Sequence, residues 1–177
     1  MNLNLSLIGA IHSLACVYAM LVGGMVIFAD KGGALHRSRG KRYMIALSVV
    51  NLTALGIYTT KGFSMFHWMA LACLLCLFIA FAAVRWRRPK PWLRIHLSAI
   101  LLSYYMLWGG AINEVFLRVE FLHALGNKTW LALSHSFVML IAFLAIAYFW
   151  GKTSKPVITL SALAHEQKPL QLYMERK

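Results

Sequence analysis

The chain has 177 residues, of which 60% are hydrophobic and 13% are charged, and its formal net charge is +13. This apolar content exceeds what the core of a soluble domain needs, so the composition excludes a soluble globular protein and indicates a bilayer protein. The positive charge does not indicate nucleic-acid binding, because the basic residues flank apolar runs. The expected partner is the lipid bilayer, and no nucleic acid.

Five apolar segments are long enough to cross a bilayer, which takes about twenty residues. No basic residue precedes the first segment, so we expect an uncleaved span there and not a secretory signal. Gly32 and Gly33 end the first segment, and Pro89 and Pro91 precede the fourth. The predicted fold is all-α, a bundle of five transmembrane helices in residues 1–150, with spans over about 5–28, 43–60, 64–84, 92–114 and 129–150.

Most of the eighteen Lys and Arg residues lie in three stretches, 30–42, 85–94 and 151–177. Cytoplasmic segments of membrane proteins are enriched in Lys and Arg, so each stretch should face the cytoplasm. Two predicted spans separate the first stretch from the second, and two more separate the second from the third. All three can therefore face one side, which predicts an N-terminus outside and a cytoplasmic tail over 151–177.

Seven histidines accompany only five acidic residues, and a histidine within a span is a candidate functional residue. At a rise of about 1.5 Å per residue, His12, His67 and His135 each lie roughly 5–12 Å below the outer surface, on three different spans. Glu114 ends the fourth span at nearly the same depth. These four residues are the candidate metal ligands, because imidazole and carboxylate groups bind transition metals.

Histidines at one depth fit two kinds of chemistry. Imidazole nitrogens ligate zinc, copper or haem iron, and a histidine beside a carboxylate relays protons to a quinone. The alternative is that each imidazole donates one hydrogen bond to a neighbouring helix and only stabilises the bundle. Because the inner side offers only His96 within a span, a single outer site is favoured over a relay of two haems.

The segment from Gly33 to Met44, GALHRSRGKRYM, resembles the HRxxGRxY stretch of a bacterial integral-membrane family, domain of unknown function 2306. The family also has a histidine near the start of the third span, matched by His67, and one opening the next span, matched by His96. Lys41 departs from the arginine that is more common there. The resemblance covers about residues 5–150 and implies a multi-pass protein of the bacterial inner (plasma) membrane, without an activity.

His36 and Arg37 are expected in the first cytoplasmic loop, which Gly32, Gly33 and Gly40 turn. They could bind an anionic head group or a partner's carboxylate, or they could only orient the loop and fix the topology. If both inner histidines act, His96 is the natural partner of His36. The candidate cofactor ligands are thus His12, His36, His67, His96 and His135.

Three function classes remain. The first is a small redox subunit that binds haem b or a transition metal and exchanges electrons with quinone or a redox partner; the histidine layout resembles that of small cytochromes b. The second is a transporter subunit, although no broken helix or inverted repeat is evident. The third is a structural or regulatory protein, alone or in an oligomer. No hydrolase or phosphate-loop pattern is found, so the sequence assigns no enzymatic activity.

Overall fold

The computed structural model describes residues 7–57, 63–87, 91–118 and 128–154. Within these ranges the chain forms long helices and no strand, as the predicted all-α fold requires. The helices are α1 (Leu7–Phe28), α2 (Ala34–Gly56), α3 (Met65–Trp86), α4 (Trp92–Arg118) and α6 (Lys128–Ser154).

Four of these helices, α1, α3, α4 and α6, are long and apolar enough to cross a membrane. The 22 residues of α1 cover about 33 Å at 1.5 Å per residue, close to the roughly 30 Å of a bilayer's hydrocarbon core. Four such helices in one chain indicate a multi-pass membrane protein. The apolar stretch of α6 extends to Thr153, so the tail predicted from residue 151 begins as helix.

The start of α2 differs from the prediction. The sequence predicts a span from residue 43, whereas α2 begins at Ala34 and includes most of the first basic stretch. Gly40 therefore lies within a helix and turns no loop. Among the glycines of this region, only Gly32, with a φ of +85°, and the N-cap Gly33 lie in the turn between α1 and α2. Lys and Arg are good helix formers, so a helix can begin within a basic stretch, ahead of the hydrophobic run that it continues into.

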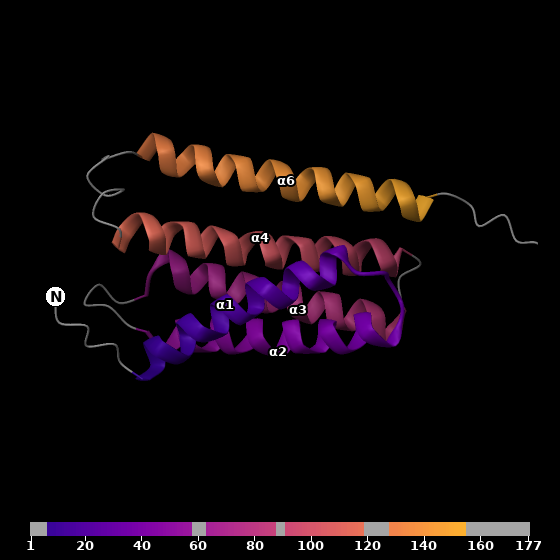
Figure 1. Ribbon diagram of the computed structural model, residues 1–177, viewed down its shortest axis with the longest axis horizontal. Helices are drawn as coiled ribbons and strands as arrows, with labels where there is room; N and C mark the ends of the chain where they lie inside the picture. Colours follow the sequence, from indigo (N-terminus) through magenta and orange to yellow (C-terminus); the bar gives the residue numbers. More distant parts are fainter. Residues whose placement is uncertain (1–6, 58–62, 88–90, 119–127, 155–177) are drawn as a thin grey trace, which may run out of the picture.

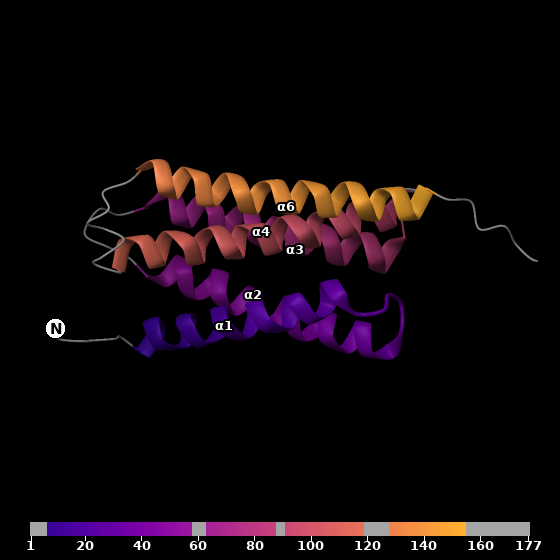
Figure 2. The same ribbon diagram turned by 45° about the horizontal axis from the view of Figure 1, so that its top comes forward.

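The helices run side by side along the long axis of the molecule (Figures 1 and 2). α1 packs against α2, α3 against α4, α2 against α3, and α6 against α4. No residue in the apolar stretch of α6 is buried, whereas 39% of the stretch in α3 is. α6 is therefore the most peripheral helix, and most of its surface is available to lipid.

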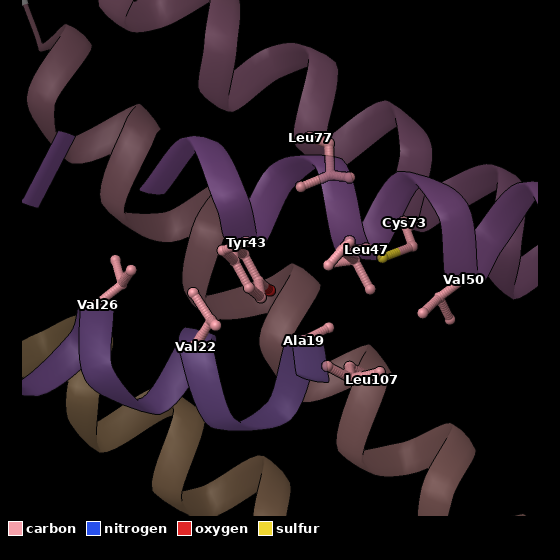
Figure 3. Close-up of a cluster of buried hydrophobic side chains, with 10 residues drawn as sticks. Ala19, Val22, Val26, Tyr43, Leu47, Val50, Cys73, Leu77 and Leu107 are labelled. Atoms are coloured by element: carbon pink, nitrogen blue, oxygen red, sulfur yellow. The ribbon is translucent and has the colours of Figure 1, made fainter. Parts of the chain in front are cut away.

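The core lies between the first four helices and consists mainly of small and medium apolar side chains (Figure 3). Tyr43 is its largest member and is only 1% exposed. The hydroxyl groups of Tyr43 and Ser103 lie 2.9 Å apart and share a hydrogen bond. The tyrosine of the HRxxGRxY-like segment therefore fastens α2 to α4.

Gly23 allows two tyrosines to approach α1. A Cβ atom at this position would lie 2.6 Å from a ring carbon of Tyr104 and 2.8 Å from a ring carbon of Tyr43. The hydroxyl group of Tyr104 donates a hydrogen bond to the carbonyl oxygen of Met20 at 3.0 Å. The missing side chain of Gly23 thus allows α1 to pack closely on the tyrosines of α2 and α4.

Consecutive helices alternate in direction, as Figure 1 shows. The end of α1, the start of α2, the end of α3, the start of α4 and the end of α6 therefore lie at one end of the bundle. The described parts of all three basic stretches lie there, and we name it the basic end. The opposite end is named the far end.

Candidate functional site

The histidines predicted to form an outer layer lie toward the far end but do not form a metal site. No three or more His, Cys, Asp or Glu residues in the described ranges lie in a group that could hold a metal ion. The structure therefore does not support the shared site expected from His12, His67, His135 and Glu114. Each of the three histidines has its own neighbours.

His12 connects α1 to α2. Its Nδ1 atom lies 3.1 Å from the carbonyl oxygen of Val50 and 3.0 Å from the hydroxyl oxygen of Thr53. A carbonyl oxygen only accepts hydrogen bonds, so Nδ1 carries the proton and Nε2 keeps its lone pair. Nε2 lies 3.6 Å from the sulfur atom of Cys16, one turn further along α1.

His67 caps the start of its own helix. The backbone N–H of Ser64 donates a hydrogen bond to Nδ1 of His67 at 2.9 Å, as in a capping box. Because Nδ1 accepts this bond, the proton of the neutral imidazole is on Nε2. A protonated ring nitrogen has no lone pair for a metal ion. His67 is buried, and its ring stacks on Phe63 with a centroid distance of 4.7 Å.

His135 is half-buried where α6 meets α4. A Cβ atom at Gly109 would lie 3.4 Å from Cε1 of His135, so the glycine allows the ring to approach α4 closely. Glu114 is an exposed residue of α4. This arrangement favours helix packing as the role of His135.

His36 and His96, in contrast, come together at the basic end. They line one cavity of about 30 Å³ together with Lys31 and Phe149, and we name this cavity the inner pocket. Five segments contribute to it: the end of α1, the turn that follows, the start of α2, the start of α4 and the end of α6. The remaining lining is aliphatic, from Val26, Ile27, Leu97, Ile100 and Leu101. A cavity of this size holds one oxygen-sized group or one water molecule.

The imidazole nitrogens around the inner pocket still have hydrogen-bonding capacity for one bound molecule. Nδ1 of His96 lies 3.0 Å from the carbonyl oxygen of Ala80, so Nδ1 is the donor and Nε2 retains a lone pair. Nδ1 of His36 is buried and has no hydrogen-bond partner among the residues that the structure describes. A buried polar atom without a partner is unfavourable, so a bound oxygen atom there would be stabilising.

Lys31 supplies the positive charge of the inner pocket. Its ammonium group donates to the carbonyl oxygens of Val26, at 2.9 Å, and Ile27, and lies 5.2 Å from the centroid of the Phe149 ring. An ammonium group has three N–H donors, so two helix-end carbonyls leave one for a ligand.

Burial and nearby charges lower the pKa values of two basic groups outside the spans, His36 and Lys31. The pKa of His36 lies below its usual value of 6.5 because of burial, and then because of Lys31 and His96. The pKa of Lys31 is also lowered, by burial and by Lys152, with Asp30 opposing. His36 is therefore a neutral imidazole at pH 7.

Contacts between α4 and α6 hold Phe149 at the wall of the inner pocket. Nε1 of Trp150 donates to the hydroxyl oxygen of Ser98 at 3.0 Å, and Nε of Arg94 donates to that of Thr153 at 3.3 Å. The Arg94 guanidinium also lies 5.5 Å from the centroid of the Trp150 ring. These bonds fix the end of α6 beside the start of α4.

Sequence reasoning identified both imidazoles of the inner pocket but missed Lys31 and Phe149. A signal for Lys31 exists, because a lysine just after an apolar helix is placed to bind its last carbonyl groups. Phe149 has no such signal, since one aromatic residue among many in an apolar span indicates only lipid contact. The role of His36 and His96 as cofactor ligands stays a prediction.

Comparison of the chain with protein-family models, with curated proteins and with solved structures gives no match. The resemblance to domain of unknown function 2306 therefore stays a prediction.

Proposed function

We propose that the chain crosses the bacterial inner membrane five times, with the N-terminus outside and the basic end in the cytoplasm. Two observations support this. α2 continues past its basic start through a mostly apolar stretch from Tyr43 to Gly56, packed between α1 and α3. The alternating helices also bring the described parts of the three basic stretches to one end of the bundle, the arrangement that the positive-inside rule favours. Arg118, which ends α4, and Lys128, which begins α6, belong to none of these stretches and lie at the far end.

We further propose that the chain is a redox-linked membrane subunit that binds a quinol, the reduced form of a membrane-soluble quinone, at the inner pocket. The observation that carries this proposal is the meeting of His36, His96 and Lys31 around one small cavity. Its aliphatic lining and its place at the end of the spans suit a lipid-soluble ligand with a small polar head.

The polar atoms of the inner pocket match a hydroxyl group. A hydroxyl both donates and accepts hydrogen bonds, so it would donate to Nε2 of His96 and accept from the remaining N–H of Lys31. The cavity of about 30 Å³ holds the hydroxyl oxygen, and the quinol ring would lie at its mouth beside Phe149.

Calorimetric titration of the detergent-purified full chain with ubiquinol-1 and with ubiquinone-1 tests the proposal. We expect the quinol to bind roughly fivefold more tightly, since only its hydroxyl can donate to the imidazole lone pair, and such a bond contributes about 1 kcal/mol. Equal affinity for the two forms, or no binding of either, would contradict the proposal.

Haem ligation by the same histidine pair is the second candidate. One observation favours it: Nδ1 of His96 is bonded to a carbonyl oxygen, the arrangement that orients metal-ligating imidazoles. A porphyrin does not fit a cavity of about 30 Å³, so α2 and α4 would have to separate. An absorption spectrum of the purified protein decides between the two, because a Soret band would establish haem and remove the quinol proposal.

A further inference from the structure

A second hollow lies on the surface between α1 and α2. It is a groove of about 380 Å³, with Leu14 and Tyr18 on the α1 side and Arg42, Ala46 and Val49 on the α2 side. It shares no lining residue with the inner pocket. The small side chain of Ala46 leaves the groove open between its neighbours.

The groove runs along the helices away from the basic end. Arg42 is its lining residue nearest that end on α2, and Val49 lies about 10 Å further along the helix at 1.5 Å per residue. Leu14 and Tyr18 belong to the apolar span of α1, and both are exposed. The medium that fills the groove is therefore the hydrocarbon of the bilayer.

Arg42 gives the groove a charged end. Its side chain is exposed and makes no ion pair within the described ranges. A guanidinium group binds phosphate through two parallel hydrogen bonds, and a long arginine side chain at a span end extends to the head-group level. An apolar channel that begins at a guanidinium group matches a lipid with a phosphate head.

From this match we infer that the groove binds one acyl chain of an anionic phospholipid of the cytoplasmic leaflet, with the lipid phosphate on Arg42. The inference rests on the proposed topology for the choice of leaflet. It does not rest on the quinol site, so either can fail without the other.

Native mass spectrometry of the full chain tests the groove. The detergent-purified protein is mixed with equimolar dioleoyl phosphatidylglycerol and dioleoyl phosphatidylcholine, and we expect it to retain the phosphatidylglycerol preferentially. Arg42→Gln should lower that retention about tenfold, because hydrogen bonds to a charged group are lost. Lys41→Gln removes the same charge from a neighbour that does not line the groove, and should leave retention nearly unchanged.

A second pair of variants tests the apolar part. Val49→Phe fills the groove without changing charge and should lower retention of both lipids. Ile45 also lines the groove and is 66% exposed, so Ile45→Trp should have the same effect without disturbing the core. Equal losses in Arg42→Gln and Lys41→Gln would show only diffuse attraction of anionic lipid and overturn the inference. Unchanged retention in both groove-filling variants would overturn it as well.

Discussion

Nδ1 of His67 accepts a hydrogen bond from the backbone N–H of Ser64, and this one bond places the imidazole proton on Nε2. His96 has the opposite arrangement, because its Nδ1 faces a carbonyl oxygen. Both residues are histidines near the start of a helix. Their partners make the first a structural cap and the second a hydrogen-bond acceptor available to a ligand.

The capping role of His67 predicts its response to substitution. A glutamine at this position of a capping box can also accept from the Ser64 amide, so His67→Gln should keep most of the stability. His67→Leu cannot accept this bond and should cost about 1 kcal/mol. Thermal denaturation in detergent measures both. Equal losses in the two variants would show that burial of the ring, and not the cap, determines stability.

The lowered pKa of His36 predicts a loss of stability in mild acid. The unfolded chain takes up a proton at His36 near its usual pKa of 6.5, while the folded chain resists it, so unfolding is favoured as the pH falls below that value. The melting temperature should therefore drop between about pH 7.5 and pH 5.5. His36→Gln should show a smaller drop. An identical drop in both proteins would place the responsible group elsewhere.

At the level of helices, close packing of α1 depends on Gly23. Its neighbour Gly24 provides a matched control, since a Cβ atom there would lie 3.4 Å from the Tyr104 hydroxyl, an ordinary contact. Both residues lie within the same helix, so helix propensity favours alanine equally at the two positions.

We expect Gly23→Ala to destabilise the protein by about 1–3 kcal/mol, because the added methyl group forces Tyr104 and Tyr43 to move. Gly24→Ala should be neutral or stabilising by up to about 1 kcal/mol. Chemical denaturation followed by helical circular dichroism measures the difference. Similar values for the two variants would mean that the tyrosines adjust freely and that Gly23 is not a packing requirement.

Hydropathy predicts α1, α3, α4 and α6 because an uncharged apolar run of about twenty residues strongly favours a membrane-spanning helix. It misplaces the start of α2, since Arg37 and Lys41 are compatible with both a loop and a helix. Residue counting predicts a depth for His12 and for His135, but it does not predict the direction that each side chain takes. His12 bonds to α2, whereas His135 packs on Gly109 of α4. These directions follow from tertiary packing, which no local pattern encodes.

At the scale of the whole molecule, most of the described basic residues and the inner pocket lie at the same end of the bundle, the basic end. The turn after α1, the start of α2, the start of α4 and the end of α6 each carry basic residues, and together with the end of α1 they build the inner pocket. The proposed topology places this pocket at the cytoplasmic head-group level, which a membrane-soluble ligand can reach by lateral diffusion.

Reporter fusions test this topology. Fusions after Gly33 and Arg88 should report the cytoplasm, and fusions after Lys61 and Gly126 should report the periplasm, because basic segments are retained on the cytoplasmic side. If the fusions after Lys61 and Arg88 report the same side, the intervening α3 does not cross the membrane and the five-span topology is wrong.

The measurement that most directly tests the central claim compares ubiquinol-1 binding by His96→Leu and His135→Leu. The first variant removes the acceptor nitrogen of the inner pocket, and the second removes a histidine near the far end. We expect calorimetric titration to give roughly fivefold weaker binding for His96→Leu, from loss of one hydrogen bond, and an unchanged dissociation constant for His135→Leu. Equal affinity in both variants and the wild type, or weaker binding only in His135→Leu, would contradict a quinol site at the inner pocket.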